Sequence, residues 1–224
     1  MMPVIRIVLL AASLSGCVGT YPASVSGSIP DVMFLSAPSR VFAVGLSIDA
    51  GDERFSTFAY QEGFVCTAHR YPVDVGAVTA ESVEAILSMS FDQVLTEPAN
   101  GHYRQYVIEP DYIEATMTGT LESLVTGAYT ADVEISLQAS VYDQQGLLLL
   151  ERHLRGHGSA RSEGSVCPKA AIAVGDAATL ALHDALDDFV RFVTLSLDRS
   201  PYGTPVIGRN QLMQDYVRAI EGVT

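Results

Sequence analysis

The chain has 224 residues and a formal net charge of −13, and 48% of its residues are hydrophobic. This length suits a single domain, and the apolar fraction is sufficient for a buried core. The acidic balance argues against nucleic acid as a partner and against broad contact with an anionic membrane surface, because both carry negative charge.

The first element is a short apolar run, Ile7 to Leu14, which follows the basic residue Arg6. It has the length of a signal-peptide core and falls short of the ~20 apolar residues of a membrane-spanning helix. Its end, Leu14-Ser15-Gly16-Cys17, resembles the lipobox of bacterial lipoproteins. The resemblance implies that residues 1–16 are a signal peptide and that Cys17 carries lipids on its thiol and amino group. An ordinary signal peptide and a buried N-terminal strand remain alternatives.

Val18 follows the cysteine. In lipoproteins of this type an aspartate at this place retains the protein in the inner membrane, so the resemblance implies the periplasmic face of the outer membrane. Residues 17–30 are predicted to be a flexible tether, because Gly, Ser, Pro and Thr are frequent there. No later segment of the sequence is apolar over the length of a membrane span.

The folded body is predicted over residues 31–198. An apolar run from Arg40 to Ile48 predicts a buried strand. A second strand is predicted from Ser56 to Thr67, because apolar and polar side chains alternate there.

A helix is predicted to begin at Thr79, a good N-cap residue. Apolar residues at helical spacing continue from Val83 to Leu95, and Pro98 ends the helix. A short strand is then predicted from Tyr103 to Glu109, stopped by Pro110.

Two long alternating runs, Ile113 to Leu121 and Tyr129 to Val141, give the clearest pattern in the body. Period-2 alternation predicts strands with one buried and one wet face, which is typical of antiparallel sheets. Asp143 to Gly146 is predicted to be a turn, and a strand from Leu147 to His157 completes the hairpin.

A second long helix is predicted from Pro168 to about Leu197, with one apolar stripe. Residues 199–224 are predicted to be a linker and a short C-terminal helix. The fold class is therefore α+β: an antiparallel sheet with two main helices packed on one face, plus the short C-terminal helix. The tail is expected to dock either on the domain or on a partner protein.

Three cysteines are present. With Cys17 lipidated, Cys66 and Cys167 remain, and an even pair in an oxidising compartment predicts a disulfide. Two unrelated buried thiols are the alternative. Neither cysteine lies in a C-x-x-C motif, so redox catalysis is not expected.

The histidines do not predict a metal site. His153 and His157 have the spacing of ligands on a helix, but on a strand they lie ~13 Å apart. His183, Asp184, Asp187 and Asp188 form an acidic helix face, which is either solvated or a weak cation site.

Catalytic and cofactor motifs are also missing from the sequence: it has no G-x-S-x-G, P-loop, dinucleotide-binding or H-E-x-x-H pattern. Gly156 to Ser159 gives a serine flanked by glycine, a pattern that is common at hairpin ends. No catalytic residue, cofactor or metal is therefore predicted.

Three segments carry a family resemblance: Pro-Asp-Tyr-Ile-Glu-Ala-Thr-Met at 110–117, Tyr-Thr-Ala-Asp-Val-Glu-Ile-Ser-Leu at 129–137 and Val-Tyr-Asp-Gln-Gln-Gly at 141–146. With the lipobox and the final long helix, they resemble small envelope lipoproteins, namely the YajG-like lipoproteins and the auxiliary lipoproteins of lipid-transport ABC systems. The resemblance implies a fold like the amino-terminal domain of TolB, and no catalytic residues. The chain departs from these families in its cysteine pair and its tail.

Two functions follow as hypotheses. The first is a non-enzymatic outer-membrane lipoprotein, anchored to the membrane at Cys17, that serves as an accessory subunit by binding an envelope protein partner. The second is an envelope enzyme or small-ligand binder, which would need a deep polar pocket with converging histidine and carboxylate groups. The sequence assigns neither the partner-binding residues nor the oligomeric state.

Overall fold

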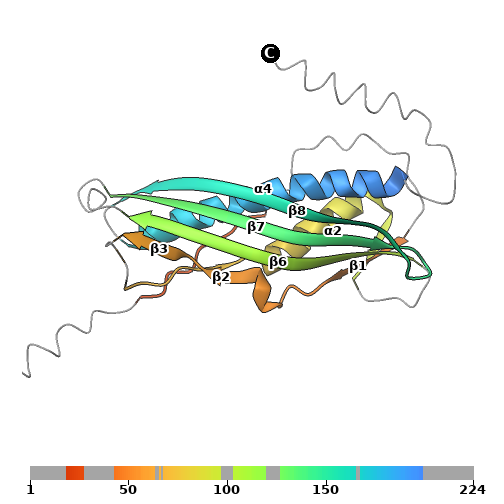
Figure 1. The fold of residues 1–224 in the computed structure, drawn as a ribbon, viewed down its shortest axis with the longest axis horizontal. Helices are drawn as coiled ribbons and strands as arrows, with labels where there is room; N and C mark the ends of the chain where they lie inside the picture. The colour runs from red at the N-terminus through yellow and green to blue at the C-terminus, as the bar shows by residue number, and fades with distance from the viewer. Residues whose placement is uncertain are drawn as a thin grey trace, which may run out of the picture.

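The computed structural model describes residues 19–27, 43–63, 66, 68–96, 103–119, 127–164 and 167–198. These residues form the mixed α+β domain that the sequence predicts, with a long sheet and two helices (Figure 1). The signal segment 1–16, the lipidation residue Cys17 and the predicted linker and C-terminal helix 199–224 lie outside the described residues.

The main sheet has six strands within the described residues, in the order β5-β1-β6-β7-β8, with β3 also alongside β6. Its strands are β1 (Ala43–Ile48), β3 (Tyr60–Gly63), β5 (Gln93–Leu95), β6 (Arg104–Gly119), β7 (Ala128–Tyr142) and β8 (Leu148–Glu163).

Strands β6, β7 and β8 pair antiparallel, as the alternation predicts. The sheet also contains parallel pairs, which the sequence pattern does not predict. They join β1 with β5, β1 with β6 and β3 with β6. Parallel neighbours need a crossover, and a helix between β1 and β5 supplies one.

Strand β6 runs through Pro110, so the prediction that this proline stops the strand is wrong. Its register with β7 shifts between Pro110 and Tyr112, which marks a bulge. A proline is tolerated at a bulge because one ladder position is already irregular there. On the other side of β6, pairing with β1 ends at Ile108 and pairing with β3 starts at Thr116, so Pro110 falls in a gap without a ladder partner on that side.

Helix α2 (Gly76–Ser90) begins one turn earlier than predicted and ends earlier. Thr79 is buried inside it, and its hydroxyl donates to the Val75 carbonyl at 2.7 Å rather than capping the helix. The Gly76 amide donates to the Asp74 side chain at 3.0 Å. The apolar residues after Ser90 belong to β5, because a short apolar run fits a strand as well as a helix.

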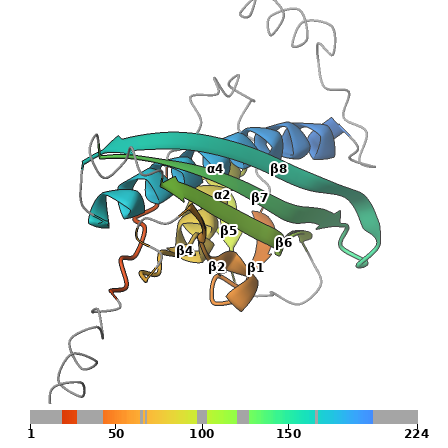
Figure 2. The same ribbon diagram turned by 60° about the vertical axis from the view of Figure 1, so that its left-hand side comes forward.

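Helix α4 (Pro168–Asp198) lies across β7 and β8, and its approach explains two glycines of β8. A Cβ atom on Gly156 would lie 1.8 Å from the Ala181 carbonyl oxygen, and one on Gly158 would lie 2.1 Å from that of Ala177. Figure 2 shows α4 running along the back of these strands. The glycine-serine pattern of residues 156–159 is therefore a packing feature of the helix and sheet.

The core lies between the sheet and the helices. Every odd-numbered residue of β7 from Tyr129 to Val141 is buried, as predicted. The apolar stripe of α4 covers this layer with small and aromatic residues: Ala170, Ala173, Val174, Ala177, Ala178, Ala181, Leu182, Leu186, Phe189, Phe192 and Val193. Figures 1 and 2 both place α2 on the same side of the sheet as α4.

A second, small sheet pairs β2 (Ser56–Phe58) with β4 (Pro72–Asp74), and the turn η1 (Glu53–Phe55) precedes it. The single strand predicted from Ser56 to Thr67 is thus divided between two sheets. Strand β2 joins the small sheet, whereas β3 pairs with β6.

Residues 19–27, which we call the strap, lie against the body (red in Figure 2). The Tyr21 amide donates to the Arg70 carbonyl at 2.9 Å, and the Ala23 amide donates to the Pro72 carbonyl at 3.0 Å. Further on, the Ser26 amide donates to the Thr179 hydroxyl of α4 at 3.1 Å. Composition places these residues in a flexible tether; hydrogen bonds to β4 and α4 hold them in place instead.

Candidate functional site

The open face of the main sheet is the first candidate surface. Because α4 covers the opposite side, the alternate residues of β6, β7 and β8 point away from the helices. Those of β8 are exposed and polar: Glu151, His153, Arg155, His157, Ser159, Arg161 and Glu163. No described helix or strand covers this face, which is as long as the three strands (Figure 1).

Charge on the open face is arranged in rows. Glu114 of β6 lies directly opposite Glu134 of β7, and Glu134 lies opposite His157 of β8. Further along β8, Arg155 and Arg161 lie opposite the neutral Ser136 and Thr130. The centre of the face is therefore acidic, with arginine and histidine along its β8 side.

Local hydrogen bonds order these polar side chains. The Tyr112 hydroxyl donates to the Glu134 carboxylate, and this bond raises the pKa of Tyr112. The Ser136 hydroxyl donates to Asp111 at 3.0 Å, and His153 Nδ1 lies 3.6 Å from the same carboxylate oxygen. The bulge that follows Pro110 places Asp111 where it reaches both side chains.

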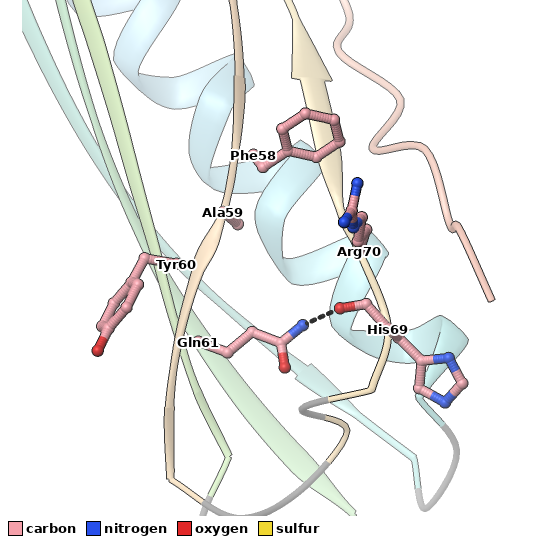
Figure 3. Close-up of a pocket in the computed structure, with 6 residues that line it drawn as sticks. All are labelled: Phe58, Ala59, Tyr60, Gln61, His69 and Arg70. Atoms are coloured by element: carbon pink, nitrogen blue, oxygen red, sulfur yellow. Dashed lines mark hydrogen bonds between the residues drawn. The ribbon is translucent and has the colours of Figure 1, made fainter. Parts of the chain in front are cut away.

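A shallow groove of about 590 Å³ is the second candidate, and it lies between β3 and the start of β4 (Figure 3). Its lining residues are Phe58, Ala59, Tyr60, Gln61, His69 and Arg70. The Gln61 side-chain amide donates to the His69 carbonyl across it, while Tyr60 points away from Arg70. One histidine and no carboxylate line the groove, so it lacks the converging acid and base groups that an envelope enzyme would need.

The predicted disulfide is present, and the Cys66 carbonyl accepts a hydrogen bond from the amide of the groove residue His69 at 3.0 Å. Cys66 and Cys167 are bonded through their sulfur atoms, with their Cα atoms 5.6 Å apart. The bond joins the loop before β4 to the residue that precedes α4. Tyr71, next to the groove residue Arg70, donates its hydroxyl to the Cys167 carbonyl at 3.1 Å.

Neighbouring groups contact the acidic face of α4. Asp188 lies 3.6 Å from Arg152 and 3.3 Å from Arg191, and the Asp184 carboxylate accepts a hydrogen bond from the His157 amide at 3.2 Å. His183 pairs with Asp187 at 4.0 Å along the helix. Asp184 and Asp188 therefore serve the contact between α4 and β8, whereas Asp187 contacts His183 of its own helix.

In the part of the chain that the structure describes, histidine, cysteine and carboxylate groups gather nowhere in a set of three that could hold a metal ion. The same residues contain no helix that is long and apolar enough to span a membrane. The sequence pattern does not predict the groove, because its residues come from two separated segments. Phe58 and Tyr60 fit the alternation of the strand predicted from Ser56 to Thr67.

Comparison with known proteins gives structural likeness only. No family model matches the chain, and no curated protein matches it. A DUF330 protein from Xanthomonas campestris has a TM-score of 0.45 at 12% identity, over 80% of this chain and 97% of that one. A minor lipoprotein from Acinetobacter baumannii has a TM-score of 0.43 at 8% identity, over 71% of this chain and 96% of that one. Likeness at this level assigns neither a family nor an activity.

Proposed function

We propose that this protein is a lipid-anchored accessory protein of the cell envelope, and that it binds a protein partner through the open face of its main sheet. The anchor is the lipidated Cys17, which the lipobox-like Leu14 to Cys17 supports. The absence of aspartate after Cys17 favours the periplasmic face of the outer membrane. This role is non-enzymatic.

The observation that carries the proposal is the arrangement of charge on the open face. Three long strands display an acidic centre beside the β8 row, in which Arg155 and Arg161 lie between Glu151 and Glu163. This fixed pattern of opposite charges selects a partner with the complementary pattern and raises the rate of encounter. A surface needed only for solubility has no requirement for such rows.

In-cell photo-cross-linking tests the proposal. A photoreactive residue at Thr130, exposed on β7, is expected to give a defined cross-linked product. The same residue at Leu180, exposed on α4, is the matched control and is expected to give none. Charge reversal with Arg155→Glu and Arg161→Glu is expected to abolish the Thr130 product, whereas Arg191→Glu on α4 retains it.

Products of equal yield from Thr130 and Leu180, or a Thr130 product that survives reversal of both arginines, would contradict the proposed face. Anchoring is checked separately. Cys17→Ser is expected to release the protein from membranes, and unchanged membrane fractionation of this variant would remove the lipid anchor from the proposal.

A further inference from the structure

The strap fixes the place where the lipid anchor leaves the domain. The Gly19 amide donates to His69 Nδ1 at 3.0 Å, and the Arg70 amide donates to the Gly19 carbonyl at 3.1 Å. A Cβ atom on Gly19 would lie 2.9 Å from the Tyr21 ring, so the chain is closely packed there. Cys17 lies two residues earlier, and two extended residues span at most ~7 Å. Lipids on Cys17 would therefore emerge beside His69 and Arg70.

The groove at this place exposes an aromatic side chain beside a basic one. Phe58 is 58% exposed, whereas Tyr60 points to the other side of its strand. The Arg70 guanidinium lies 5.8 Å from the centre of the Phe58 ring, and Figure 3 shows both on the same side of the groove. Aromatic rings beside a long basic side chain are typical of surfaces that sit in the headgroup layer of a bilayer, where the rings are half-buried and the cation reaches lipid phosphate.

We propose that this groove rests on the bilayer that holds the Cys17 lipids, with Phe58 in the headgroup layer and Arg70 at the lipid phosphates. The inference deepens the proposed function and rests on its lipid anchor. The lining carries basic groups and no carboxylate, although the exposed Glu62 follows on β3. In a chain of net charge −13, such a lining is suited to a surface of lipid phosphates.

This contact sets the orientation of the whole domain. Strands β6 to β8 extend from the groove end for about 50 Å. The hairpin that joins β7 to β8 lies at the opposite end of the molecule from β3 (Figure 1). With the groove on the bilayer, the open face stands clear of the membrane along most of its length.

Tryptophan fluorescence tests the orientation, because the chain contains no tryptophan. Phe58→Trp introduces a single reporter in the groove. Leu147→Trp, in the hairpin and 65% exposed, is the matched control. Each full-length lipidated variant is reconstituted into phosphatidylcholine and phosphatidylglycerol vesicles with and without brominated acyl chains. We expect about a twofold quenching of Phe58→Trp by brominated lipid and none of Leu147→Trp.

Two controls separate the possible failures. Mass spectrometry of the N-terminal peptide reports lipids on Cys17, and vesicle flotation reports anchoring. A lipidated, floating Phe58→Trp variant that brominated lipid leaves unquenched would overturn the inference while the anchor stands. Equal quenching of Leu147→Trp would also overturn it, because the domain would then have no preferred orientation. An unmodified Cys17 would overturn both the inference and the proposed anchor.

Discussion

At the scale of single residues, two buried tyrosines, one beside the small sheet and one in the main sheet, form hydrogen bonds near the start and end of α4. Tyr71 donates to the Cys167 carbonyl, and Tyr106 on β6 shares a 2.6 Å hydrogen bond with Ser196 near the end of α4. Burial raises the pKa of both side chains, and the pKa of Tyr71 reaches about 12. The neutral hydroxyls are therefore part of the fold, since each needs its proton in the buried state.

The alkaline stability of the protein is expected to depend on Tyr71. Its pKa is higher in the folded chain than in the unfolded one, where tyrosine has a pKa of about 10. Its contribution to the free energy of unfolding is fully present below pH ~10. This contribution falls by up to ~1.4 kcal/mol per pH unit as the pH rises toward ~12. Tyr71→Phe should lower the free energy of unfolding by ~1 kcal/mol at pH 8 through the lost hydrogen bond. The free energy of unfolding of this variant should then decline less steeply with pH above ~10.

Urea unfolding of wild type, Tyr71→Phe and the exposed control Tyr60→Phe at several pH values above 8 measures this effect. Tyr60→Phe should decline with pH as the wild type does. Parallel curves for the wild type and Tyr71→Phe would show that this hydroxyl does not control the alkaline transition.

At the scale of elements, the contact of α4 with β8 depends on the glycines of the strand. Gly156 and Gly158 let the helix backbone approach within contact distance, opposite Ala181 and Ala177. Asp184 from the same helix accepts from the His157 amide and so occupies part of the free edge of β8. Glycine in a strand interior, normally a weakness, here allows the close approach of another backbone.

Gly158→Ala is expected to destabilise the domain by about 3 kcal/mol, because the added methyl group meets helix backbone rather than a movable side chain. Gly45→Ala in β1 is the control, since the nearest atom to its Cβ lies 3.7 Å away, an ordinary contact distance. Thermal unfolding of both variants compares them. A Gly158→Ala protein as stable as Gly45→Ala would mean that α4 can shift at no cost.

The disulfide is expected to stabilise the folded protein, because it crosslinks two segments that are distant in the chain. It closes a loop with a sequence separation of 101 between Cys66 and Cys167. In the chain-entropy description a loop of this size contributes up to ~4.7 kcal/mol by restricting the unfolded chain. Replacing both cysteines with serine should lower the urea midpoint accordingly, and wild type under reducing conditions should match the variant. Unequal midpoints for these two samples would point to a local effect of the serines.

These elements show what the sequence could reveal. The alternation in β6 and β7 predicted their buried faces, because that signal is local and repeats over many residues. The parallel pairs, the division at Ala59 and the course of β6 through Pro110 depend on partners distant in the chain, which periodicity does not carry. The groove likewise combines two segments, and the second of them, His69 and Arg70, was linked to a predicted feature only through the nearby disulfide residue Cys66.

At the scale of the whole molecule, the strap connects the small sheet to both helices. It pairs with residues 70–72. A Cβ atom on Gly27 would lie 3.1 Å from side chains of α2, so the strap is also close to that helix. Gly175 of α4 leaves room for it, since a Cβ atom there would lie 2.4 Å from the Ser24 carbonyl oxygen. A segment with the composition of a linker is thus held by its neighbours, through backbone bonds that composition does not report.

Gly175→Ala is expected to displace the strap while the body stays folded. Alanine favours a helix interior over glycine by ~1 kcal/mol, so α4 itself should be retained. Hydrogen exchange measured by mass spectrometry should show loss of protection at the Tyr21 and Ala23 amides, with β7 unchanged. The control Gly45→Ala should keep strap protection. Retained protection in Gly175→Ala would show that the strap accommodates the methyl group.

The course of the strap also determines how the protein would respond to force. A partner held at the open face and lipids held in the bilayer would pull on the chain in opposite directions, and the load would enter at Gly19. Because the strap runs parallel to the segment it pairs with, a pull along its axis would stretch the hydrogen bonds at Tyr21 and Ala23 together instead of peeling them apart one by one. The attachment would therefore act as a mechanical clamp, with the crosslink between Cys66 and Cys167 limiting how far the adjoining loop extends.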